Sequence, residues 1–150
     1  LFAAAQDRES LAAIVPSGML PAHWLFLTGR RSGQMPAVLG VDLFNDPFCR
    51  VLGGAMTVDD YVGAEVAAAR QVADATLLSI AASPGRDAAL QSLARRDVPQ
   101  YRCTGNFAAG QRAVMLGDRA TARGLFSEAA DAAVDLLERY VAKAERARLA

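Results

Sequence analysis

The sequence feature that most constrains the fold is a Gly-Asp pair, Gly117-Asp118, which separates two runs of helix-forming residues. Glycine permits the positive backbone angles of a tight turn, and an aspartate that follows it can cap the next helix. Small residues recur on both sides of the pair at the spacing of one helical face. The stretch Tyr101–Asp135 therefore predicts a helix, a tight turn, and a second helix that packs back on the first.

The rest of the chain has the composition of a helical protein. It contains 150 residues, which is the size of one domain, and 53% of them are hydrophobic. Many of these are alanine, the strongest helix former. No segment alternates polar and apolar residues over a length typical of a strand. We therefore predict a single all-α domain, 1–150, with about seven to nine helices, several of them paired as antiparallel hairpins.

Proline and glycine residues set the boundaries of the predicted elements. The long segment that begins after Thr57 has the form of a capped helix, and Gly63 within it indicates a kink or a close helix contact. We predict a first helix at 6–15, a helix hairpin at 21–45, a short segment at 48–52, a long helical segment at 58–82, a short helix at 86–95, the hairpin at 101–133, and a capping helix at 134–149.

The predicted helix at 58–82 and the predicted capping helix at 134–149 each have an apolar face. In the segment 58–82 the expected buried side runs from Tyr61 to Val72 and beyond. In the capping helix, Leu137, Tyr140 and Val141 form the expected buried stripe. The charged residues of the capping helix, which include Glu138 and Glu145, are predicted to form its outer face.

Charge and hydropathy exclude several classes of protein. The 16 basic and 16 acidic residues give a formal charge of +0, so the chain lacks the general attraction to phosphates that drives nucleic-acid binding. No run of eighteen apolar residues exists, so no membrane span is expected.

The first residue is Leu1, so we expect a processed, trimmed or partial chain, and both the cytoplasm and the periplasm are possible compartments. Cys49 and Cys103 are expected to be buried thiols.

The sequence contains no recognisable catalytic or metal-binding motif. His23 is the only histidine, which is too few for the spacings of zinc sites, and Gly53-Gly54 lacks the Lys-Ser/Thr of a phosphate loop. We expect a structural or surface role for His23. Arg30-Arg31 lies at the expected end of a helix, where cations offset the helix dipole. We predict no catalytic residues, no metal and no cofactor, and a small enzyme that uses His23 remains the least favoured alternative.

The stretch Tyr101–Asp135 resembles a tetratricopeptide repeat. In that repeat, small residues at fixed positions let two helices approach closely, and an aromatic residue fills the space beside them. The residues that carry the resemblance are Gly110, the Gly117-Asp118 turn, Ala122, Phe126 and Ala129. The stretch departs from the pattern at Asn106, Ala113 and Val134. The order of elements is also similar to that of bacterial tetratricopeptide-repeat proteins of the kind that includes the NlpI-like lipoproteins.

This resemblance implies a right-handed stack of helix hairpins, or an irregular bundle, closed by the capping helix. Proteins of this kind are non-enzymatic adaptors of the bacterial cell envelope that bind a protein or peptide partner. The first helix of each hairpin lines their binding groove, which here implicates Thr104, Phe107, Gln111, Val114 and Met115. The alternative to an adaptor is a self-associating helical domain that forms a homodimer through its apolar face.

Overall fold

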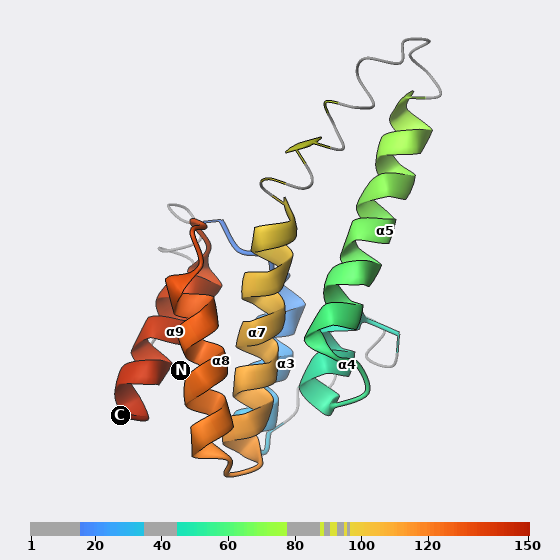
Figure 1. Ribbon diagram of the computed structural model, residues 1–150. Helices are drawn as coiled ribbons and strands as arrows, with labels where there is room; N and C mark the ends of the chain where they lie inside the picture. The colour runs from blue at the N-terminus through green and yellow to red at the C-terminus, as the bar shows by residue number, and fades with distance from the viewer. Residues whose placement is uncertain (1–15, 35–44, 78–87, 89–90, 93–94, 96) are drawn as a thin grey trace.

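The computed structural model describes residues 16–34, 45–77, 88, 91–92, 95 and 97–150. These residues form six α-helices and no strand, which confirms the predicted all-α class (Figure 1). The predicted helix at 6–15, the second arm of the hairpin at 21–45, and most of the helix at 86–95 lie outside the described residues. The helices are α3 (Pro21–Ser32), α4 (Pro47–Gly53), α5 (Val58–Leu77), α7 (Val98–Met115), α8 (Arg119–Asp131) and α9 (Leu137–Arg148).

The centre of the fold is the α7–α8 hairpin, whose helices pack as the sequence predicts. Gly117 has a φ of 78°, and the Asp118 carboxylate accepts a hydrogen bond from the Thr121 amide over 3.0 Å. A Cβ atom on Gly110 would lie 2.7 Å from the ring of Phe126, so only glycine permits this approach. α7 extends three residues further toward the N-terminus than predicted, because a proline fits the first turn of a helix.

Helices α4 and α5 pack on the other side of α7. The Thr57 hydroxyl caps α5 by accepting the Asp60 amide over 3.1 Å. The predicted close helix contact at Gly63 is wrong, because no atom of a neighbouring element lies within 4 Å of the position its Cβ would take. The far end of α5 extends away from the other helices (Figure 1), which leaves Val72, expected to be buried, 67% exposed.

The last helix, α9, closes the opposite edge of the fold against α8. It begins at Leu137, three residues later than predicted, because Leu136 is extended and the Leu137 amide donates to the Pro16 carbonyl over 2.9 Å. The predicted buried stripe of α9 is correct for Leu137 and Val141, but it is wrong for Tyr140 and for the two glutamates assigned to the outer face. Glu138 and Glu145 are buried, whereas Tyr140 is 44% exposed. The helix is therefore rotated so that two acidic side chains face the interior.

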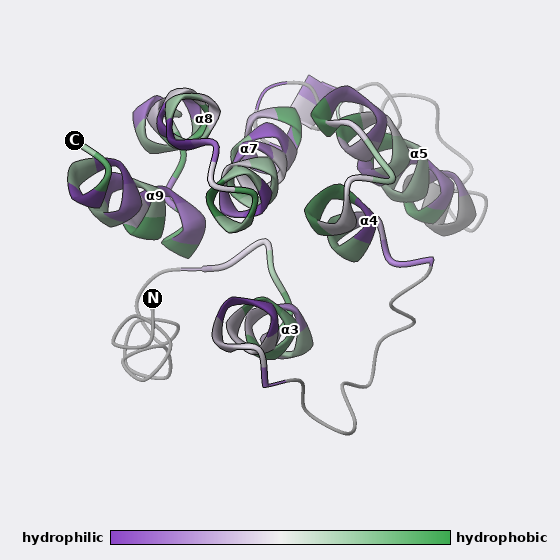
Figure 2. Ribbon diagram, turned by 90° about the horizontal axis from the view of Figure 1, so that it is seen from below, coloured by the Kyte–Doolittle hydropathy of each residue, from purple (hydrophilic) through white to green (hydrophobic). Residues whose placement is uncertain are grey.

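Helix α3 lies against α7, with α9 and α4 on either side (Figure 2). Its backbone does not approach these helices as closely as α7 approaches α8. Large side chains fill the space instead, since the ring of Trp24 lies against the ring of Phe107 with centroids 5.6 Å apart. None of the described helices is long and apolar enough to cross a membrane.

Candidate docking face

Five buried side chains form the surface on which α3 rests, and we call them the docking face. They share a spacing of one or two helical turns within α7 and α9, so each helix presents them on one side. All five are less than 4% exposed. The docking face consists of Thr104, Phe107 and Gln111 from α7 and of Glu138 and Glu145 from α9.

At one end of the docking face, Glu138 holds the chain that leads into α3. Its Oε1 atom accepts the Ser17 hydroxyl over 2.8 Å and the Met19 amide over 2.7 Å. The Trp24 indole N–H donates to the Ser17 hydroxyl over 3.2 Å. Burial raises the pKa of Glu138, although these hydrogen bonds oppose part of that effect. The Ser17–Met19 turn is thus attached to α9 by a buried carboxyl group.

Apolar contacts fill the middle of the docking face. Trp24 packs on Phe107 at an interplanar angle of 47°, and Phe107 in turn lies beside Phe126 at 6.1 Å. Leu27, one turn after Trp24 on α3, has no exposed surface. Aromatic pairs in such tilted geometry contribute about 0.5–1.5 kcal/mol beyond the area they bury. The aromatic side chains therefore link α3 to the core of the hairpin.

At the other end, Arg31 turns inward to two polar residues of the docking face. Its Nη1 donates to Gln111 Oε1 over 2.9 Å, and its Nη2 lies 4.0 Å from Glu145 Oε1. Arg148 also donates to Glu145, over 2.6 Å. Burial lowers the pKa of Arg31, and the charge of Glu145 opposes that effect. Arg30-Arg31 lies at the end of α3, as predicted, but the Arg31 side chain points inward and contacts the docking face.

Not all polar atoms of the docking face have partners. Within the described residues, three buried side-chain atoms make no hydrogen bond, and all three belong to the docking face: Thr104 Oγ1, Gln111 Nε2 and Glu138 Oε2. Native proteins satisfy the large majority of buried polar groups, so unpartnered atoms require an explanation. Their concentration on one surface indicates that α3 covers this surface without matching its polar pattern.

Beside the docking face, His23 connects α3 to α4. Its Nε2 lies 2.9 Å from Asp46 Oδ2, its Nδ1 accepts the Leu20 amide over 3.1 Å, and its ring stacks on Phe48 at 4.8 Å. Because Nδ1 accepts an N–H, the ring proton belongs on Nε2, where it is donated to Asp46. Asp46 also caps α4 by accepting the Cys49 amide over 3.0 Å. Burial would raise the pKa of Asp46, but the hydrogen bonds from His23 and Cys49 outweigh it and lower the pKa.

The polar atoms of His23, Asp46 and Cys49 lie within 4.8 Å of one another, a donor set that suits a metal ion or a cysteine nucleophile. The hydrogen bonds oppose both uses. Both ring nitrogens of His23 are engaged, so neither is free to act as a base for Cys49 or to bind a metal without breaking a contact. Burial, together with the charge of Asp46, raises the pKa of the Cys49 thiol to about 12. The geometry fits a clamp between α3 and α4.

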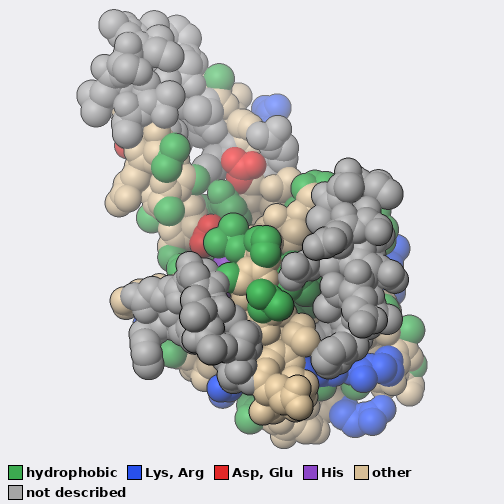
Figure 3. Space-filling model, turned by 180° about the vertical axis from the view of Figure 1, so that it is seen from behind, with side chains coloured by type: hydrophobic (Ala, Val, Ile, Leu, Met, Phe, Trp, Pro, Cys, Tyr) green, Lys and Arg blue, Asp and Glu red, His purple; other side chains and the backbone are tan. Residues whose placement is uncertain are grey.

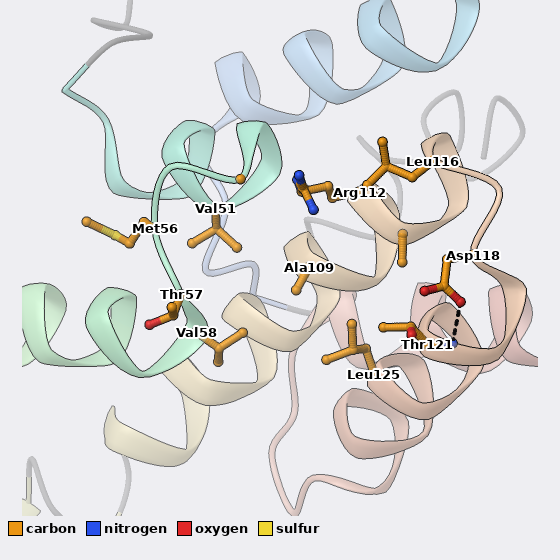
Figure 4. Close-up of a pocket in the computed structure, with 12 residues that line it drawn as sticks. Val51, Met56, Thr57, Val58, Ala109, Arg112, Leu116, Asp118, Thr121 and Leu125 are labelled. Atoms are coloured by element: carbon orange, nitrogen blue, oxygen red, sulfur yellow. Dashed lines mark hydrogen bonds between the residues drawn. The ribbon is translucent and has the colours of Figure 1, made fainter.

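Two open pockets lie on the opposite face of α7. One has a volume of about 240 Å³ and lies between the α4–α5 turn, α7 and the start of α8 (Figure 4). Its lining is mainly apolar, with Arg112 and Asp118 at its polar edge. The other has a volume of about 420 Å³ and lies between the first half of α7 and the end of α8. None of the unpartnered atoms lines either pocket, so the docking face is the stronger candidate site.

The structure divides the five groove residues expected from the sequence. Thr104, Phe107 and Gln111 form the α7 side of the docking face, beneath α3, whereas Val114 and Met115 are half-buried against the core. Sequence reasoning missed Glu138 and Glu145, which it placed on the outer face of the last helix. Their seven-residue spacing, with Val141 between them on the same side, is the signal that would have identified an acidic face.

The comparisons with known proteins add no relationship to this geometry. No protein-family model matches the chain, and no curated protein or solved structure is significantly similar to it. The function must therefore be inferred from the docking face itself.

Proposed function

We propose that the chain is a non-catalytic helical adaptor that binds a helix of a protein partner on its docking face. In this proposal α7 and α8 form a tetratricopeptide-like hairpin, α9 is the capping helix of a right-handed stack, and α3 occupies the place of the partner helix. The contacts of α3 support this arrangement, since Trp24 packs on Phe107 and Arg31 donates to Gln111, and both of these α7 residues belong to the first helix of the hairpin.

The observation that carries the proposal is the way in which α3 is held. Where α7 meets α8, small residues bring the backbones together, as at Gly110. Where α3 meets the docking face, contact depends on the large side chains Trp24 and Arg31 and on isolated hydrogen bonds. Tryptophan and arginine are the residues that most often dominate the energy of protein interfaces. The contact of α3 thus has the character of a bound ligand helix.

The test uses the full chain with Trp24→Ala and Arg31→Ala, which we call the opened chain. A fluorescent peptide with the sequence of residues 16–34, the native peptide, is titrated while its anisotropy is followed. We expect saturable binding to the opened chain. Binding to the unsubstituted chain should be much weaker, because its own α3 competes at an effective concentration of about millimolar.

A peptide of the same length that carries both alanines is the matched control and should not bind. Circular dichroism first establishes that the opened chain keeps its helices. If a folded opened chain fails to bind the native peptide, the docking face does not accept a separate helix and the proposal is wrong.

Self-association is the second candidate function, and exposed hydrophobic residues favour it. Leu20 and Leu25 are 55% and 47% exposed, and hydrophobic side chains gather near the middle of the face shown in Figure 3. Exposed apolar patches often mark contacts between proteins. Light scattering over a concentration series tests this candidate, and a constant monomer mass would eliminate it.

A further inference from the structure

The unpartnered atoms of the docking face carry information about its ligand. Thr104 Oγ1, Gln111 Nε2 and Glu138 Oε2 are buried where α3 and the Ser17–Met19 turn before it meet α7 and α9, and none of the three atoms has a hydrogen-bond partner. A helix that belonged permanently to this surface would be expected to match its polar atoms. The α3 helix therefore resembles an incomplete copy of the ligand for which the surface is suited.

The charges of the docking face indicate what is missing. Glu138 and Glu145 lie seven residues apart, on the side of α9 that faces α3. Glu145 has cations beside it, since Arg148 donates to it and Arg31 approaches to 4.0 Å. Glu138 receives the Ser17 hydroxyl and the Met19 amide, and the backbone amides of Gly18 and of Glu138 itself also lower its pKa, but no cation of the described residues pairs with it. One of two similar acidic positions thus has basic partners and the other has none.

The register of α3 identifies the position where a second basic residue belongs. α3 runs parallel to α7 and α9, because Trp24 precedes Arg31 just as Phe107 precedes Gln111 and Glu138 precedes Glu145. The residue seven positions before Arg31 is Trp24, and its indole N–H reaches Glu138 through the Ser17 hydroxyl. A basic side chain at this position of a partner helix would meet Glu138 directly.

We propose that the docking face recognises a partner helix with two basic residues seven positions apart, one for Glu138 and one for Glu145. This inference rests on the proposed docking function and names its ligand class. An arginine suits the first position, because its N–H groups can reach both Glu138 Oε2 and Thr104 Oγ1 while its plane lies against Phe107. A hydrogen-bond acceptor beside the second basic residue of the partner helix would accept the free N–H of Gln111 Nε2.

The experiment titrates three labelled peptides of residues 16–34 into the opened chain: the native peptide, a two-arginine peptide with Trp24→Arg, and a control with Trp24→Ala. The two-arginine peptide should bind about tenfold more tightly than the control, as a new charge-assisted hydrogen bond implies. Its affinity should fall as salt is added. If the opened chain loses its helical signal, the same titrations use the full chain with Arg31→Ala alone.

A second variant of the protein, the opened chain with Glu138→Gln, identifies the group responsible. Glutamine keeps an acceptor oxygen for Ser17 and Met19 but removes the negative charge, so the two-arginine peptide and the control peptide are compared with each other on this same variant. The advantage of the two-arginine peptide over the control should disappear. If arginine gives no advantage, or if Glu138→Gln leaves that advantage intact, the basic-helix inference is overturned while binding of the native peptide still upholds the docking function. If no peptide binds, the docking function itself fails.

Discussion

Replacement of Glu138 gives the most informative single perturbation of the fold. Its side chain has no exposed surface, and its Oε1 accepts hydrogen bonds from Ser17 and Met19. In Glu138→Ala the Ser17 hydroxyl loses its acceptor in a buried site, and the Met19 amide keeps only the Ser17 oxygen, 3.1 Å away. At about 1–2 kcal/mol for each hydrogen bond, the free energy of unfolding should fall by about 2–4 kcal/mol. This is a large part of the total of about 5–15 kcal/mol that is typical of a domain.

Glu138→Gln should behave differently, because glutamine keeps an acceptor oxygen for Ser17 and Met19. Burial raises the pKa of Glu138, so the folded chain binds a proton more tightly than the unfolded chain does. The stability that this proton contributes is present below pH of about 4 and is lost as pH rises through the raised pKa of the folded state. Near neutral pH, Glu138→Gln should therefore equal or exceed the unsubstituted chain in stability.

The assay is urea denaturation followed by circular dichroism, repeated between acidic and neutral pH. The unsubstituted chain should show a decrease in stability with rising pH that Glu138→Gln reduces. Two results would refute the reasoning. One is an alanine variant within about 0.5 kcal/mol of the unsubstituted chain, the range typical of surface substitutions. The other is a glutamine variant as unstable as the alanine variant.

Two further predictions concern packing and thiol chemistry. Gly110→Ala should lower the free energy of unfolding by about 1–3 kcal/mol in a urea titration, because its methyl group meets the ring of Phe126. The matched control is Gly124→Ala, whose methyl group meets no atom within 4 Å and which should raise the free energy of unfolding by about 0.5–1 kcal/mol. Equal effects of the two substitutions would contradict the packing argument. Cys49 and Cys103 should react with a thiol reagent at pH 8 only after denaturant is added, because burial raises the pKa of each thiol to about 12. Rapid labelling of the folded chain would disprove the burial of these thiols.

The hairpin of α7 and α8 was predictable because its determinants are local. Gly117 specifies the turn, and the small residues of the two helices lie at regular helical spacing on faces that meet. The predicted start of α9 was wrong because the helix end depends on the Pro16 carbonyl, which is distant in the sequence. Local patterns therefore indicate which segments are helices more reliably than they indicate where helices end.

The docking face was only partly predictable. Thr104, Phe107 and Gln111 were identified through the resemblance to a repeat whose first helix lines a groove. Glu138 and Glu145 were assigned to the outer face, because burial of an acidic side chain is costly and a helix with many charged residues normally exposes them. Their seven-residue spacing places the two acids on one face of the helix, and the contacts of α3 and of the turn before it, distant in sequence, show that this face points inward.

Native-state hydrogen exchange shows most directly whether α3 can leave the docking face while the rest of the protein stays folded. Amide exchange of the full chain is followed by mass spectrometry at increasing urea below the unfolding transition. If α3 can leave the docking face, its amides should exchange through a local opening with weak urea dependence. The amides of α7 and α8 should exchange only on global unfolding. If the amides of α3 show the same opening free energy and urea dependence as those of α7, α3 is an integral part of the core and the account is contradicted.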